Sequence, residues 1–145
     1  MTSNTTYNIT YNVTGVEWIL LGDRPLAVII SREFEPMATQ FITPPQGVQQ
    51  VGFVKYPQGG TIARHFHTPL ERHLVGTPET LLVRSGKVEV SLYDDEQALV
   101  ARRILEVGDV LVLLGGGHGF EMLEDTVLLE VKQGPYTGLV EKARF

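Results

Sequence analysis

Short runs in which apolar and polar residues alternate cover most of the chain, and Gly, Pro or Asp interrupts them every few residues. Alternation with a period of two is typical of a half-buried β-strand, and no stretch keeps the 3.6-residue period of a helix. Strands are predicted at residues 17–21, 26–30, 40–43, 49–56, 61–67, 79–84, 87–93, 100–105, 110–114, 118–123 and 126–132. The pattern therefore predicts an all-β protein, a sandwich or barrel with little or no helix.

Length and composition favour one globular domain. The 145 residues are 43% hydrophobic and 20% charged, which is ordinary for a soluble domain. We expect an N-terminal arm over residues 1–15 and one barrel domain over 16–145. The net charge of −5 argues against nucleic acid and anionic membranes as partners. Because neither a signal peptide nor a membrane-length apolar run is visible, we expect a cytoplasmic protein.

The most informative chemistry is a pair of histidines, His65 and His67, two residues apart on the predicted strand 61–67. Side chains alternate across a strand, so both imidazoles should point to the same face. Thr61 and Ala63 share that face and are small, which leaves room for a ligand. Two imidazoles side by side inside a barrel each need a partner, and a metal ion supplies one.

A carboxylate and a third imidazole fit the same site. Glu79 opens the predicted strand 79–84, and its parity places it on one face with Leu81 and Val83. A buried carboxylate is costly without a cation, so this position also indicates a metal. His118 follows a run of glycines at the start of another predicted strand. The predicted metal ligands are therefore His65, His67, Glu79 and His118. With no cysteine in the chain, thiolate ligands are excluded.

The segment 68–78 between two predicted strands is long for a hairpin connection, and long loops are often functional. It contains Glu71, Arg72 and His73. These residues are expected at the barrel mouth, where they are candidates for substrate contact or proton transfer. A solvated charged loop is the alternative interpretation.

The spacing of these residues resembles the cupin superfamily. Residues 59–86, with a glycine, the His65-Phe66-His67 triplet, Glu79 and a closing glycine, are similar to the first cupin motif, and residues 108–118 to the second. The amino-acid sequence of the C-terminal half is similar to those of small stand-alone bacterial cupins. The connection between His67 and Glu79 is longer than is usual in the family. Glu71 stands at the usual distance and is the alternative carboxylate ligand.

The resemblance implies a cupin-type jelly roll, a double-stranded β-helix. A set of three imidazoles and one carboxylate suits one divalent Mn, Fe, Co, Ni or Zn ion and leaves positions open for substrate. We therefore expect a metal-dependent enzyme, an isomerase, epimerase or dioxygenase, that acts on a small oxygen-rich metabolite. A non-catalytic small-molecule-binding cupin and a metal-free sugar isomerase or epimerase are the alternatives. Ile62 and Phe66 face away from the predicted site, which suggests a homodimer.

Overall fold

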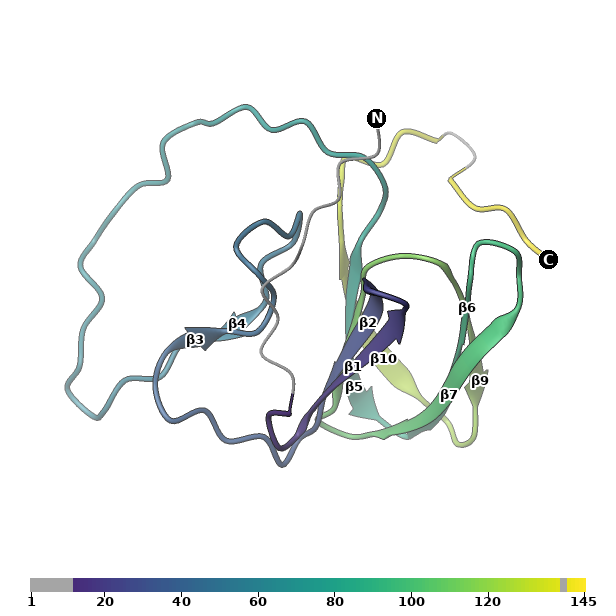
Figure 1. Ribbon diagram of the computed structural model, residues 1–145. Coiled ribbons are helices and arrows are strands. Elements are labelled where there is room, and N and C mark those ends of the chain that lie inside the picture. Colours follow the sequence, from purple (N-terminus) through teal and green to yellow (C-terminus); the bar gives the residue numbers. More distant parts are fainter. Residues whose placement is uncertain (1–11, 139–140) are drawn as a thin grey trace. The chain divides into compact units, whose positions relative to one another are not determined.

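The computed structural model describes residues 12–138 and 141–145, and this part of the chain is all-β, as predicted (Figure 1). Its strands form three antiparallel sheets, and none of the described residues lies in a helix. It follows that no helix of the described part could cross a membrane. The strands are β1 (Val16–Leu21), β2 (Arg24–Ile30), β3 (Gln40–Phe41), β4 (Gly52–Phe53), β5 (Glu79–Ser85), β6 (Lys87–Tyr93), β7 (Leu99–Glu106), β8 (Val110–Leu113), β9 (Gly117–Met122) and β10 (Val127–Lys132).

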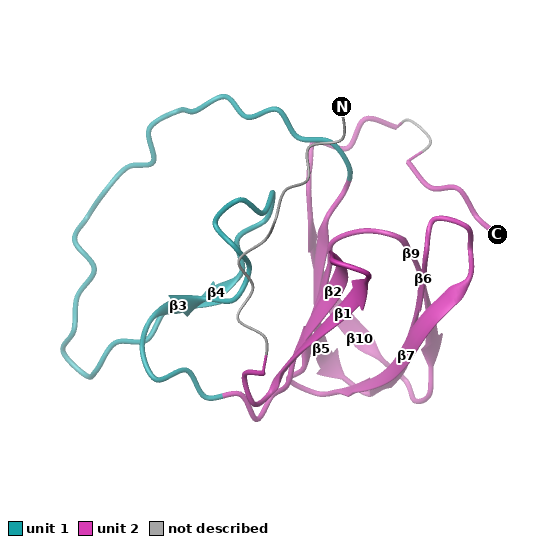
Figure 2. Cartoon of the chain, viewed as in Figure 1, with its two compact units in different colours: residues 1–9, 35–76 teal, residues 10–34, 77–145 magenta. Residues whose placement is uncertain are grey.

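The chain divides into two compact units (Figure 2). The described part of the first unit is residues 35–76, and that of the second is residues 12–34, 77–138 and 141–145. Much of the predicted N-terminal arm, residues 1–11, lies outside the described residues.

The second unit contains two of the sheets. One has five strands in the order β1-β2-β8-β5-β10, and the other has three in the order β7-β6-β9. Alternate residues of β6 are buried, as the alternation in the sequence predicts: Val88, Val90 and Leu92 are fully buried. They pack in one hydrophobic cluster with residues of the five-stranded sheet, which include Leu81 and Leu111. The core of this unit therefore lies between the two sheets.

An ion pair joins edge strands of the two sheets. Arg103 on β7 donates to Glu17 on β1 from Nε (2.8 Å) and from Nη2 (2.5 Å), both to Oε1. Both side chains are about half exposed, so the pair sits at the margin of the core. Among the described strands, hydrogen bonding between strands does not close the sheets into a barrel.

The first unit contains the two-stranded sheet of β3 and β4. These strands are much shorter than the predicted strands 40–43 and 49–56. The predicted strand 61–67 is wrong: residues 60–73 form no regular structure and are all exposed. A strand needs a neighbour for its backbone hydrogen bonds, and no described strand pairs with this segment. Its alternation of apolar and polar residues leaves Ile62 and Phe66 57% and 97% exposed.

Candidate functional site

Glu79 is the first residue of β5 and, among the described residues, the one charged residue that is buried, with 6% of its surface exposed. Leu81 and Val83 are buried on the same face of the strand, as the parity of the sequence predicts. The pairing with β8 places Leu113 opposite Glu79. The carboxylate thus lies at the end of the hydrophobic core, where an uncompensated charge would be costly.

His118 provides the partner of this carboxylate. It is the second residue of β9, and its Nε2 lies 3.2 Å from Oε2 of Glu79. The imidazole also packs edge-to-face on Phe120, with ring centroids 5.6 Å apart. The His118 side chain is 31% exposed against 7% for that of Glu79. The pair is therefore buried on the carboxylate side and open to solvent on the imidazole side.

The spacing of the two donor atoms fits a shared metal ion. At metal–ligand distances of about 2.1 Å, neighbouring donors lie about 3.0 Å apart on an octahedral ion and about 3.4 Å apart on a tetrahedral one. The observed 3.2 Å between Glu79 and His118 lies between these values. It is longer than the roughly 2.7–2.9 Å of a charge-assisted hydrogen bond. The donor types, imidazole nitrogen and carboxylate oxygen, are those that divalent transition metals take.

Lys132 adds a positive charge that sequence reasoning missed. It is the last residue of β10 and lies directly opposite Glu79 in the pairing with β5, so the two side chains project from the same face. Its ammonium lies 3.2 Å from the Glu130 carboxylate, two residues earlier on that face. Glu130 raises the pKa of Lys132 through this contact, and the charges of Glu79 and Glu141 raise it further.

The other predicted ligands, His65 and His67, lie in the first unit, on the exposed segment between β4 and β5. Their rings are adjacent, with centroids 5.2 Å apart and planes at 74°. Nδ1 of His65 is 2.8 Å from the carbonyl oxygen of Ala63. Because a carbonyl only accepts, Nδ1 must carry the hydrogen in this contact, which leaves the Nε2 lone pair of His65 available to a metal.

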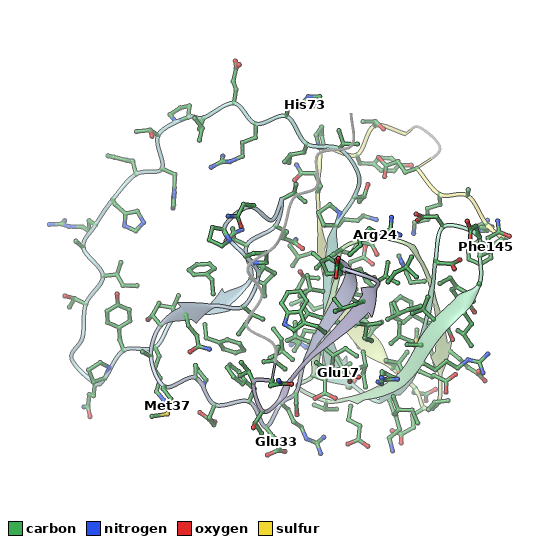
Figure 3. The ribbon with its side chains drawn as sticks, viewed as in Figure 1. Glu17, Arg24, Glu33, Met37, His73 and Phe145 are labelled. Atoms are coloured by element: carbon green, nitrogen blue, oxygen red, sulfur yellow. The ribbon has the colours of Figure 1, made fainter. Side chains whose placement is uncertain are left out.

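Glu71, Arg72 and His73 lie on the same exposed segment (Figure 3, His73). The structure thus brings the predicted site residues together as two pairs, His65 with His67 and Glu79 with His118, each within its own unit. Within the described residues, no three His, Asp or Glu side chains gather closely enough to hold a metal ion.

Comparison of the chain with family models, with curated protein sequences and with solved structures finds no significant match to any of the three.

Proposed function

We propose that this protein is a cupin-type β-barrel that binds one divalent transition-metal ion. We further propose that it is an enzyme that uses this ion to act on a small, oxygen-rich metabolite. The observation that carries the proposal is the contact between Glu79 and His118, a buried carboxylate and an imidazole from different sheets with donor atoms 3.2 Å apart. Sequence spacing, and not geometry, adds His65 and His67 to this ligand set. Such an ion would supply Lewis acidity for isomerisation or, as iron, a site for dioxygen.

The protein's own groups would have distinct tasks. Glu79 contributes the negative charge that offsets part of the metal's charge at the end of an apolar core. His118, with the more exposed side chain of the pair, faces the side from which a small molecule would arrive. Lys132 offers an ammonium on the face of Glu79 and could bind a carboxylate or hydroxyl oxygen of the substrate. The expected substrates are therefore anionic or chelating oxygen compounds.

The test is elemental analysis of the full chain, purified without a histidine tag or added metal. We expect about one equivalent of Mn, Fe, Co, Ni and Zn combined, and large losses in Glu79→Gln and His118→Ala. Glu71→Gln is the matched control, because Glu71 is the alternative carboxylate and is exposed. Less than about a tenth of an equivalent in the wild type would contradict metal binding.

Two further histidine variants test the wider ligand set. His67→Ala should release the metal, whereas His73→Ala, six residues along the same exposed segment, should not. Retention of the metal in His67→Ala would remove this histidine from the ligand set while leaving Glu79 and His118 in place. A panel of hydroxy acids and sugars then separates the enzyme from a non-catalytic binding protein. Product formation supports the enzyme, and a higher melting temperature without product supports binding alone.

A metal-free isomerase or epimerase is a second candidate, and the same contact favours it. A carboxylate beside an imidazole orients the ring and stabilises its protonated form, which suits His118 as a general base. This candidate requires turnover in the presence of a strong chelator. If chelation abolishes activity and added metal restores it, the metal-free mechanism is wrong.

A further inference from the structure

Phe145 lies beside Tyr93, at the end of the second unit at which β9 begins (Figure 3). The ring of Phe145 meets that of Tyr93 edge-on, with centroids 5.2 Å apart and planes at 89°. Tyr93 is the last residue of β6 and pairs with Gly117, the first residue of β9. Phe145 therefore lies at the end of the β6–β9 pairing, where the last residue of β6 is opposite the first residue of β9.

Gly117 is the residue that makes room for this ring. A Cβ on Gly117 would lie 3.0 Å from Cζ and 3.1 Å from Cε1 of Phe145, and 3.4 Å from Cβ of Tyr93. Gly119, two residues along the same strand, has nothing within 4 Å of an added Cβ. The aromatic contact thus covers one side of the strand start and stops short of Gly119.

The start of β9 lies at the edge of its sheet. Among the described strands, β6 is the one to which β9 is hydrogen-bonded. Its first residue is a glycine that follows two other glycines, and glycine has the greatest backbone freedom to lose on folding. His118 is the next residue, so any movement of this strand end moves the imidazole relative to Glu79.

We propose that Phe145 acts as a clasp that fixes the start of β9, and that it is thereby a positioning residue for His118. The proposal rests on the proposed function in one respect: it takes His118 to be a metal ligand. Loss of a hydrogen bond to the second ring nitrogen of a metal-ligating histidine typically weakens metal affinity about 10- to 100-fold. Phe145 acts on His118 through the strand and not through such a bond, so we expect an effect at the low end of this range.

The experiment compares Zn²⁺ affinity in the full chain, measured by competition with a chromophoric chelator, for four variants. Phe145→Ala removes the ring and should weaken binding about tenfold. Gly117→Ala should do the same, because its Cβ displaces the ring, whereas Gly119→Ala is the matched control and should have little effect. In the double variant Phe145→Ala/Gly117→Ala, the second change should add little, since the ring it would displace is gone.

A second measurement separates positioning from mere stability. The imidazole ¹H–¹⁵N signals of His118, recorded without metal, should shift in Phe145→Ala and in Gly117→Ala but not in Gly119→Ala. Phe145→Leu keeps an apolar side chain over Gly117 and should restore most of the wild-type behaviour. A lower melting temperature in Phe145→Ala, with unchanged Zn²⁺ affinity and unchanged imidazole signals, would overturn the clasp. So would equal damage from Gly119→Ala and Gly117→Ala.

The two proposals can fail separately. If the wild type binds no Zn²⁺, metal binding fails, and the imidazole signals alone decide the clasp: the expected shifts support it, and their absence overturns it. If the wild type binds Zn²⁺ and Phe145→Ala binds it equally well, metal binding stands and the clasp is wrong.

Discussion

Three leucines of the second unit differ in burial but carry the same side chain, so truncating each to alanine measures how the two sheets pack. Leu92 on β6 is fully buried. On β10, Leu128 packs against the hydrophobic cluster. Its neighbour Leu129 points to the other face and is 49% exposed. The structure therefore predicts that the cost of truncation falls from Leu92 to Leu128 to Leu129.

The magnitudes follow from the burial of each side chain. Leu92→Ala leaves a cavity between two packed sheets, for which losses of about 3–5 kcal/mol are typical. Leu128 is partly buried, so about 2 kcal/mol is expected from the lost transfer energy and a smaller cavity. Leu129 keeps about half of its surface in water in the folded state, which limits the loss to roughly 1 kcal/mol.

The assay is urea unfolding followed by circular dichroism at 25 °C, with a chelator present so that bound metal does not contribute. The variants should share one m-value and differ in midpoint. A loss for Leu129→Ala as large as that for Leu128→Ala would mean that β10 faces the other way, and Lys132 would then not share a face with Glu79. A loss below about 1.5 kcal/mol for Leu92→Ala would refute a core between the two sheets.

Two electrostatic predictions concern the margins of the same unit. A double-mutant cycle on Arg103 and Glu17 should give a coupling of about 0.5–1 kcal/mol that shrinks in high salt, because the pair is bidentate but half exposed; zero coupling at low salt would contradict the ion pair. Glu106 accepts a hydrogen bond from Lys87. This bond, together with the positive charges of Lys87 and Arg32, holds the pKa of Glu106 below its ordinary value of 4.5. The contribution of Glu106 to the free energy of unfolding is therefore fully present above pH 4.5, and it is lost as the pH falls through the lowered pKa. Glu106→Gln should flatten the acid limb of stability, measured as urea midpoints between about pH 7 and pH 3; an unchanged acid limb would count against these ion pairs.

The strands that the sequence predicted well are those that pack a full face on the core. The strand predicted at 87–93 has the same bounds as β6, because each buried residue alternates with a polar one. The same reasoning placed Glu79 on the inner face with Leu81 and Val83, and the structure confirms this parity. For such strands, the alternation of apolar and polar residues in the sequence already shows which residues face the core.

Sequence reasoning failed where the outcome depends on a distant partner. Residues 61–67 alternate as a strand should, yet alternation cannot supply a neighbouring strand to bond with. On β10 the β-branched residues Val127 and Val131 are exposed, so hydrophobicity alone does not show which face of this strand is turned to the core. Only the register with β5, in which Lys132 opposes Glu79, reveals the charge beside the site.

The Arg103–Glu17 ion pair joins residues that are 86 positions apart in the chain, and β2 finds its partner β8 over a similar separation. When strands so distant in the chain form a sheet, the entropy cost of closing large loops arises before the stabilising contacts form. Folding of this unit should accordingly take milliseconds to seconds rather than microseconds. During synthesis, β1 and β2 emerge long before β8, so this hairpin exposes an unpaired strand edge until β8 is made, and such edges are prone to aggregation.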